Sequence, residues 1–204
     1  MSNIGLAFAL VNSLTNHFGP LAALSGLWRG HGGVDFSFHH ADDKPADTSY
    51  REEITFKPFG PVDNGDQSLY GLDYKMAAWR ASEDDPFHTE VGYWLWCSQL
   101  SHVMRGFVIP RGSAILAGGK VKPDADSFTL RADANSDEYG ITQNPYLLIN
   151  ARCTAYELNL SVHDATLTYD ETSTLEMKEF DEPFQHTDRN VLHRVESFEL
   201  PPAR

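Results

Sequence analysis

Apolar and polar residues alternate with a period of two along much of the chain. The alternation is regular in residues 34–39 and 156–163, where every second side chain is apolar. Successive side chains of a β-strand point to opposite faces, so this period predicts strands with one buried face. The turn signal His163-Asp164-Ala165 separates the second stretch from Leu167 and Tyr169, and therefore predicts a β-hairpin.

Further segments rich in β-branched and aromatic residues predict strands at 52–56, 70–79, 89–97, 103–109, 114–116, 127–132 and 184–200. Breakers such as Lys57-Pro58, Asp63-Asn64-Gly65 and Gly118-Gly119 fall between them. Strands that follow one another without a helical crossover favour an antiparallel meander, and closure into a barrel removes its exposed edges. We therefore expect an all-β fold, a single antiparallel up-and-down β-barrel of about ten strands with a short N-terminal helix.

The N-terminal segment has the one helical pattern in the chain. Ile4, Phe8, Val11 and Leu14 fall on one stripe, and Gly19-Pro20 is expected to end the helix. We expect residues 1–204 to form one domain, with residues 1–18 as a helical extension that plugs or caps the barrel. No basic residue precedes Arg29, which is not typical of a signal peptide.

Charge and cysteine content narrow the partners and the compartment. The chain has 29 acidic and 16 basic residues and a formal net charge of −13, which disfavours nucleic acid and anionic membranes as partners. Cys97 and Cys153 have no metal-binding or redox spacing, so a reducing, cytoplasmic location is expected. A small hydrophobic molecule is the expected partner, and a homodimer stays open.

Two histidine–carboxylate pairs are the main candidates for chemistry. His88 and Glu90, and likewise His186 and Asp188, are two residues apart, so each pair should share one face of a strand. Facing an apolar interior, such groups could move protons; facing water, they would only be solvated. Arg111 could bind a ligand carboxylate or form a structural pair. The Gly-x-Ser-x-Gly nucleophile elbow of hydrolases, phosphate-binding glycine loops and Cys-x-x-Cys motifs are absent from the sequence.

Several motifs follow one another in an order that resembles the nitrobindin-like relatives of fatty-acid-binding proteins. They span roughly Gly19 to Val195 and comprise Gly-x-Trp-x-Gly-x-Gly at 26–32, Tyr-x-Glu-Glu-x-x-Phe at 50–56, Pro-Phe-His-x-Glu-x-Gly-Tyr at 86–93, Pro-x-Gly at 110–112, Leu-Thr-Tyr at 167–169 and Pro-Phe-Gln at 183–185. Their combined order is more specific than any one of them.

The resemblance implies a barrel that holds haem b through one axial histidine on the last long strand. In the family this histidine lies two residues after the Gln of Pro-x-Gln; here that position is Thr187, and His186 precedes it. A one-residue offset turns a side chain to the opposite face, so His186 can replace the missing metal ligand only through a shifted register or a bulge. The cofactor-binding candidates are His186, Thr187, His88, Phe87 and Trp28.

Two functions follow as expectations, beside the third option of an interaction module without a ligand. The first is intracellular binding of haem or another small hydrophobic ligand in the barrel. The alternative is a haem-free, lipocalin-like isomerase or lyase that acts on a hydrophobic or aromatic metabolite. Its candidate acid–base residues are His88, Glu90, His186 and Asp188.

Overall fold

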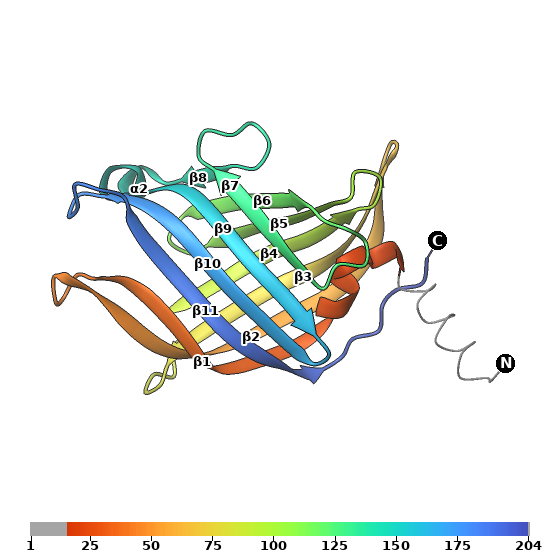
Figure 1. The fold of residues 1–204 in the computed structure, drawn as a ribbon, viewed down its shortest axis with the longest axis horizontal. Coiled ribbons are helices and arrows are strands. Elements are labelled where there is room, and N and C mark those ends of the chain that lie inside the picture. The colour runs from red at the N-terminus through yellow and green to blue at the C-terminus, as the bar shows by residue number, and fades with distance from the viewer. Residues whose placement is uncertain (1–15, 204) are drawn as a thin grey trace.

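A computed structural model describes residues 16–203 of the chain, in which eleven strands form one antiparallel sheet (Figure 1). The elements are η1 (Asn16–Leu24), β1 (Gly26–His39), β2 (Lys44–Asn64), β3 (Gln67–Arg80), β4 (His88–Cys97), β5 (His102–Ile109), β6 (Ser113–Lys120), β7 (Ser127–Asp133), β8 (Ile141–Gln143), α2 (Pro145–Asn150), β9 (Ala151–His163), β10 (Thr166–Met177) and β11 (Phe184–Glu196). Within this described part, ten strands close into a barrel, and β8 is an extra strand beside β6. The predicted all-β barrel is confirmed.

The predicted hairpin is confirmed, because β9 and β10 pair from His163 and Thr166 outward. The strand predicted at 52–56 was too short, since β2 continues past Lys57-Pro58, and a register shift between Phe59 and Val62 absorbs the irregularity. The strand predicted at 184–200 was too long: β11 leaves the sheet after Glu196, where its partner strand β1 also begins.

A 3₁₀ segment closes one end of the barrel. The predicted helical stripe from Ile4 to Leu14 lies outside the described residues, but η1 buries Phe18, Leu21 and Leu24 completely in the barrel end. Gly19 lies inside η1 with φ of 51°, and a Cβ there would lie 2.5 Å from the Trp96 ring. Residues 16–24 therefore close this end of the barrel, and the non-helical backbone of Gly19 breaks the helix where the sequence predicts its end.

Trp28 belongs to this closed end. Its Nε1 donates a hydrogen bond to the Leu24 carbonyl at 2.7 Å, and the Arg194 guanidinium lies 4.5 Å from the centre of its ring. In Figure 1, η1 and α2 lie at opposite ends of the barrel, so the turns beside α2 surround the other end. Within residues 16–203, we find no helix with the length and apolar character needed to cross a membrane.

Candidate functional site

A cavity of about 550 Å³ lies at the end of the barrel opposite η1. This volume is typical of small-molecule sites, at roughly 300–1,000 Å³. The turns between β1 and β2, β3 and β4, and β5 and β6 surround its mouth together with α2. Its apolar lining includes Phe87, Phe107, Ile109, Ile115, Leu175 and Phe184.

Strand β11 presents His186 and Asp188 to this cavity, and Thr187 is not among the lining residues. The pairing of β11 with β10 is regular from Phe184 to His193, so the alternation of a strand alone places His186 inward, and no bulge is needed. The side chain of His186 is 35% exposed, and its Nε2 donates to Asp35 Oδ2 on β1 at 2.7 Å. Its carboxylate partner is thus Asp35, which the sequence did not suggest.

Strand β4 contributes His88 and Glu90 to the cavity wall. Nε2 of His88 donates to Glu90 Oε1 at 3.3 Å, while Glu90 Oε2 accepts from the Tyr74 hydroxyl at 2.7 Å and from Arg105 Nη2 at 2.5 Å. Glu90 is 2% exposed. This expected pair therefore faces inward, with a buried carboxylate whose acceptor positions are largely occupied.

Arg105 on β5 is the buried cation that connects the two walls of the cavity. Its Nη2 binds Glu90, as described above. Its Nη1 donates to Glu171 Oε2 on β10 at 2.9 Å and to the Tyr156 hydroxyl. This hydroxyl in turn donates to Glu171 at 2.7 Å. The face of Phe107 lies 4.2 Å from the guanidinium carbon. A buried arginine is tolerable here because two carboxylates and aromatic faces compensate for lost hydration.

The charge of Arg105 decides the protonation of its neighbours. Burial alone would raise the pKa of Glu90, but the charge of Arg105 and the hydrogen bonds from His88 and Tyr74 together outweigh it, and the pKa falls to about 2. Burial lowers the pKa of His88, yet its hydrogen bond to Glu90 and the charges of Glu90 and Glu171 together raise it by more. Glu90 is thus a fixed carboxylate that orients His88, rather than a base poised near neutrality.

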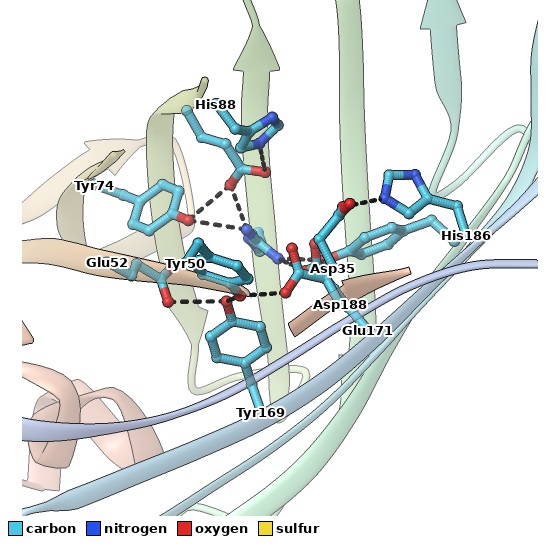
Figure 2. A network of polar contacts seen from close by, with 12 residues as sticks. Asp35, Tyr50, Glu52, Tyr74, His88, Tyr169, Glu171, His186 and Asp188 are labelled. Carbon is cyan, nitrogen blue, oxygen red and sulfur yellow. Dashed lines mark hydrogen bonds and ion pairs between the residues drawn. The ribbon is translucent and has the colours of Figure 1, made fainter. Parts of the chain in front are cut away.

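Asp188 has the opposite character. Burial and the charge of Glu171 raise its pKa to about 9, because the hydrogen bond that it accepts from the Tyr50 hydroxyl does not compensate. In the sheet, Asp188 lies directly between Glu171 on β10 and Asp35 on β1 (Figure 2). Asp188 therefore carries a proton at neutral pH and is a hydrogen-bond donor in the cavity wall.

The structure brings together most of the residues expected from the sequence. His88, Phe87, Glu90, His186, Asp188 and Arg111 line the cavity, whereas Trp28 lies in the closed end and Thr187 outside the lining. Sequence reasoning missed Asp35, Arg105 and Glu171. Arg105 could have been found, since it shares strand parity with buried Val103 and Phe107. In residues 16–203, no cluster of three or more His, Cys, Asp or Glu side chains could hold a metal ion.

Comparison with known proteins gives two findings. A sequence model described as "THAP4-like, heme-binding beta-barrel domain" matches residues 17–194. Among solved structures, Rv2717c from M. tuberculosis is similar with a TM-score of 0.63 and 20% identity, over 89% of this chain and 98% of that one. At this identity the likeness concerns the fold alone. No curated protein matches the chain significantly.

Proposed function

Because the chain belongs to the THAP4-like, heme-binding β-barrel domain family, we propose that its cavity binds one small, largely apolar molecule, with haem b as the first candidate. The match agrees with the resemblance to nitrobindin-like proteins. The observation that carries the proposal is the position of His186, which faces the cavity with one ring nitrogen held by Asp35.

The residues of the cavity fit haem in two respects. A metal-bound histidine usually donates its other ring N–H to a carboxylate, which fixes the ring and strengthens the ligand, and Asp35 supplies this carboxylate to His186. The structure records no hydrogen bond between Nδ1 of His186 and any described residue. Because Nδ1 lies beside Cβ, iron would be held better by a ring turned over, with Nδ1 bonded to Asp35 and Nε2 facing the cavity. The apolar lining suits the faces of a porphyrin. Haem would supply an iron able to bind a further small ligand.

Titration with haemin tests this assignment. The wild type should shift the Soret band, and His186→Ala should weaken or abolish binding. His193→Ala is the matched control, because His193 lies on the same strand but is exposed. Asp35→Asn should bind haemin about 10–100-fold more weakly.

The outcomes separate the alternatives. No Soret shift in the wild type would end the haem proposal, and unchanged affinity and spectrum in His186→Ala would remove His186 from the role.

A second candidate function, acid–base catalysis, is supported by the ionisable groups of the same cavity. His88 with Glu90, His186 with Asp35, and the protonated Asp188 all line one partly apolar cavity. A neutral carboxylic acid can donate to a ligand carbonyl or phenolate while an imidazole accepts a proton, which suits isomerisation or elimination on a hydrophobic metabolite.

Native mass spectrometry of the purified protein tests this candidate first, by giving the mass of any retained compound. That compound should exchange carbon-bound hydrogen for deuterium in D₂O with the protein present. His88→Ala and Asp188→Asn should each slow the exchange about 100-fold or more. Exchange at the wild-type rate in both variants would refute acid–base catalysis by these residues.

A further inference from the structure

A second, smaller cavity lies inside the barrel. It has a volume of about 20 Å³, and about 10–15 Å³ is enough for one water molecule. Most of its lining is apolar, including Ile54, Phe56, Leu158, Leu160 and Leu167. Glu171 lines both this inner cavity and the larger cavity described above, which we call the outer cavity.

Three buried side chains of the inner cavity carry a polar atom without a partner among residues 16–203. These atoms are Glu52 Oε1, Arg105 Nε and Trp94 Nε1. The residues are 3%, 4% and 2% exposed, so bulk water does not reach them. An unsatisfied buried donor or acceptor costs about 1–3 kcal/mol, and such groups are rare in folded proteins. Three residues that line one small space thus supply one acceptor and two donors, a set that a water molecule can satisfy.

We propose that the inner cavity binds one water molecule, which accepts hydrogen bonds from Arg105 Nε and Trp94 Nε1 and donates one to Glu52 Oε1. Two to four polar partners are what a buried water needs. The charges around the cavity favour a neutral occupant: Arg105 is already neutralised by Glu90 and Glu171, so an anion would meet carboxylates and a cation would meet Arg105.

This water joins two hydrogen-bonded chains that otherwise end separately. Glu52 Oε2 accepts from Tyr169 at 2.9 Å, the hydroxyls of Tyr169 and Tyr50 lie 2.8 Å apart, and Tyr50 donates to Asp188 in the outer cavity (Figure 2). Asn190 Nδ2 also donates to Glu52 Oε2, at 2.7 Å.

The other chain runs from His88 through Glu90 to Arg105. Burial raises the pKa of Glu52 to about 7, although its bonds from Asn190 and Tyr169 lower it. The ionisable groups around it are Arg105, Glu171, Glu90, Tyr74, Tyr169, Tyr50 and Asp188. The water therefore places a carboxyl that titrates near neutrality between both walls of the ligand cavity, as an internal proton store.

Water-selective NMR of the wild-type protein tests the site directly. The chain has four tryptophans, and loss of one indole signal in Trp94→Phe assigns Trp94. The Trp94 indole proton should show a nuclear Overhauser effect to a long-lived water. Trp28 is the internal control, because its equally buried indole donates to the Leu24 carbonyl and should show none. Absence of the effect at Trp94 overturns the proposal.

Two variants identify the partners of the water. Glu52→Leu removes one of the three partners and should weaken or abolish the effect; an unchanged effect would overturn the assignment to Glu52. Tyr169→Phe removes a nearby hydroxyl whose exchanging proton could mimic water, so the effect should persist there, and its loss would also overturn the proposal. If Glu52→Leu does not fold, the wild-type comparison of Trp94 with Trp28 still decides. None of these outcomes depends on which molecule occupies the outer cavity.

Discussion

Replacing Glu52 by Gln should remove a pH dependence from the stability of the barrel. The carboxyl has an ordinary pKa of 4.5, which burial raises to about 7 in the folded chain. Between these values the folded state binds more protons than the unfolded state, so the free energy of unfolding falls as pH rises. The contribution is fully present below pH 4.5 and is lost as pH passes 7. At about 1.4 kcal/mol per pH unit, the loss is about 3 kcal/mol.

Urea unfolding followed by tryptophan fluorescence between pH 4.5 and 7.5 measures this term. Gln keeps a carbonyl oxygen for Tyr169 and Asn190 but does not titrate, so the stability of wild type relative to Glu52→Gln should fall by about 3 kcal/mol across the range. Glu53→Gln is the matched control: its exposed carboxylate pairs with Arg29, and its difference from wild type should stay nearly constant. A constant difference for Glu52→Gln as well would refute the raised pKa.

Three further substitutions test other parts of the structure. Asp188→Asn should gain stability relative to wild type in urea unfolding as pH rises from about 4 towards 9, because burial and Glu171 raise the pKa of Asp188 from 3.8 to about 9 and the unfolded state loses this proton first; a difference that stays constant over the range would contradict this. Arg105→Leu leaves the buried carboxylate of Glu90 and the partly buried one of Glu171 without their cation and should cost about 3–5 kcal/mol in chemical denaturation, whereas a loss below about 1 kcal/mol would show that the pairing is dispensable. Gly92→Ala would place a Cβ 2.0 Å from a backbone oxygen of β5 and should lower the melting temperature, while Gly32→Ala, with nothing within 4 Å, should not.

The strands were predictable because a period of two is a direct consequence of strand geometry. Residues 156–163 alternate apolar and polar side chains, and β9 buries Tyr156, Leu158, Leu160 and Val162. Residues that usually end a strand were a less reliable guide to strand boundaries, since Lys57-Pro58 lies within β2 rather than at its end. The short elements β8 and α2 carry too few residues for a periodic signal, and were not predicted.

The polar interior was only partly predictable. Glu52 shares its face with Ile54 and Phe56, so its position among buried residues follows from parity alone. The partners of such groups do not follow, because they depend on how the barrel closes. His186 and Asp35 are 151 positions apart and meet only because β11 pairs with β1. The sequence therefore indicates which polar side chains are buried, but closure of the sheet decides which of them meet.

The hydrogen bonds within the barrel limit what the outer cavity can recognise. The carboxylates of Asp35, Glu90 and Glu171 all accept from protein donors, so a ligand rich in donors would have to displace bonds that already exist. On strand β11, the groups left for a ligand are the proton of Asp188 and the second ring nitrogen of His186. Because these polar groups are held in place before binding, recognition costs little reorganisation. The cavity should therefore favour a molecule that is apolar over most of its surface and offers one metal or one acceptor group to this wall.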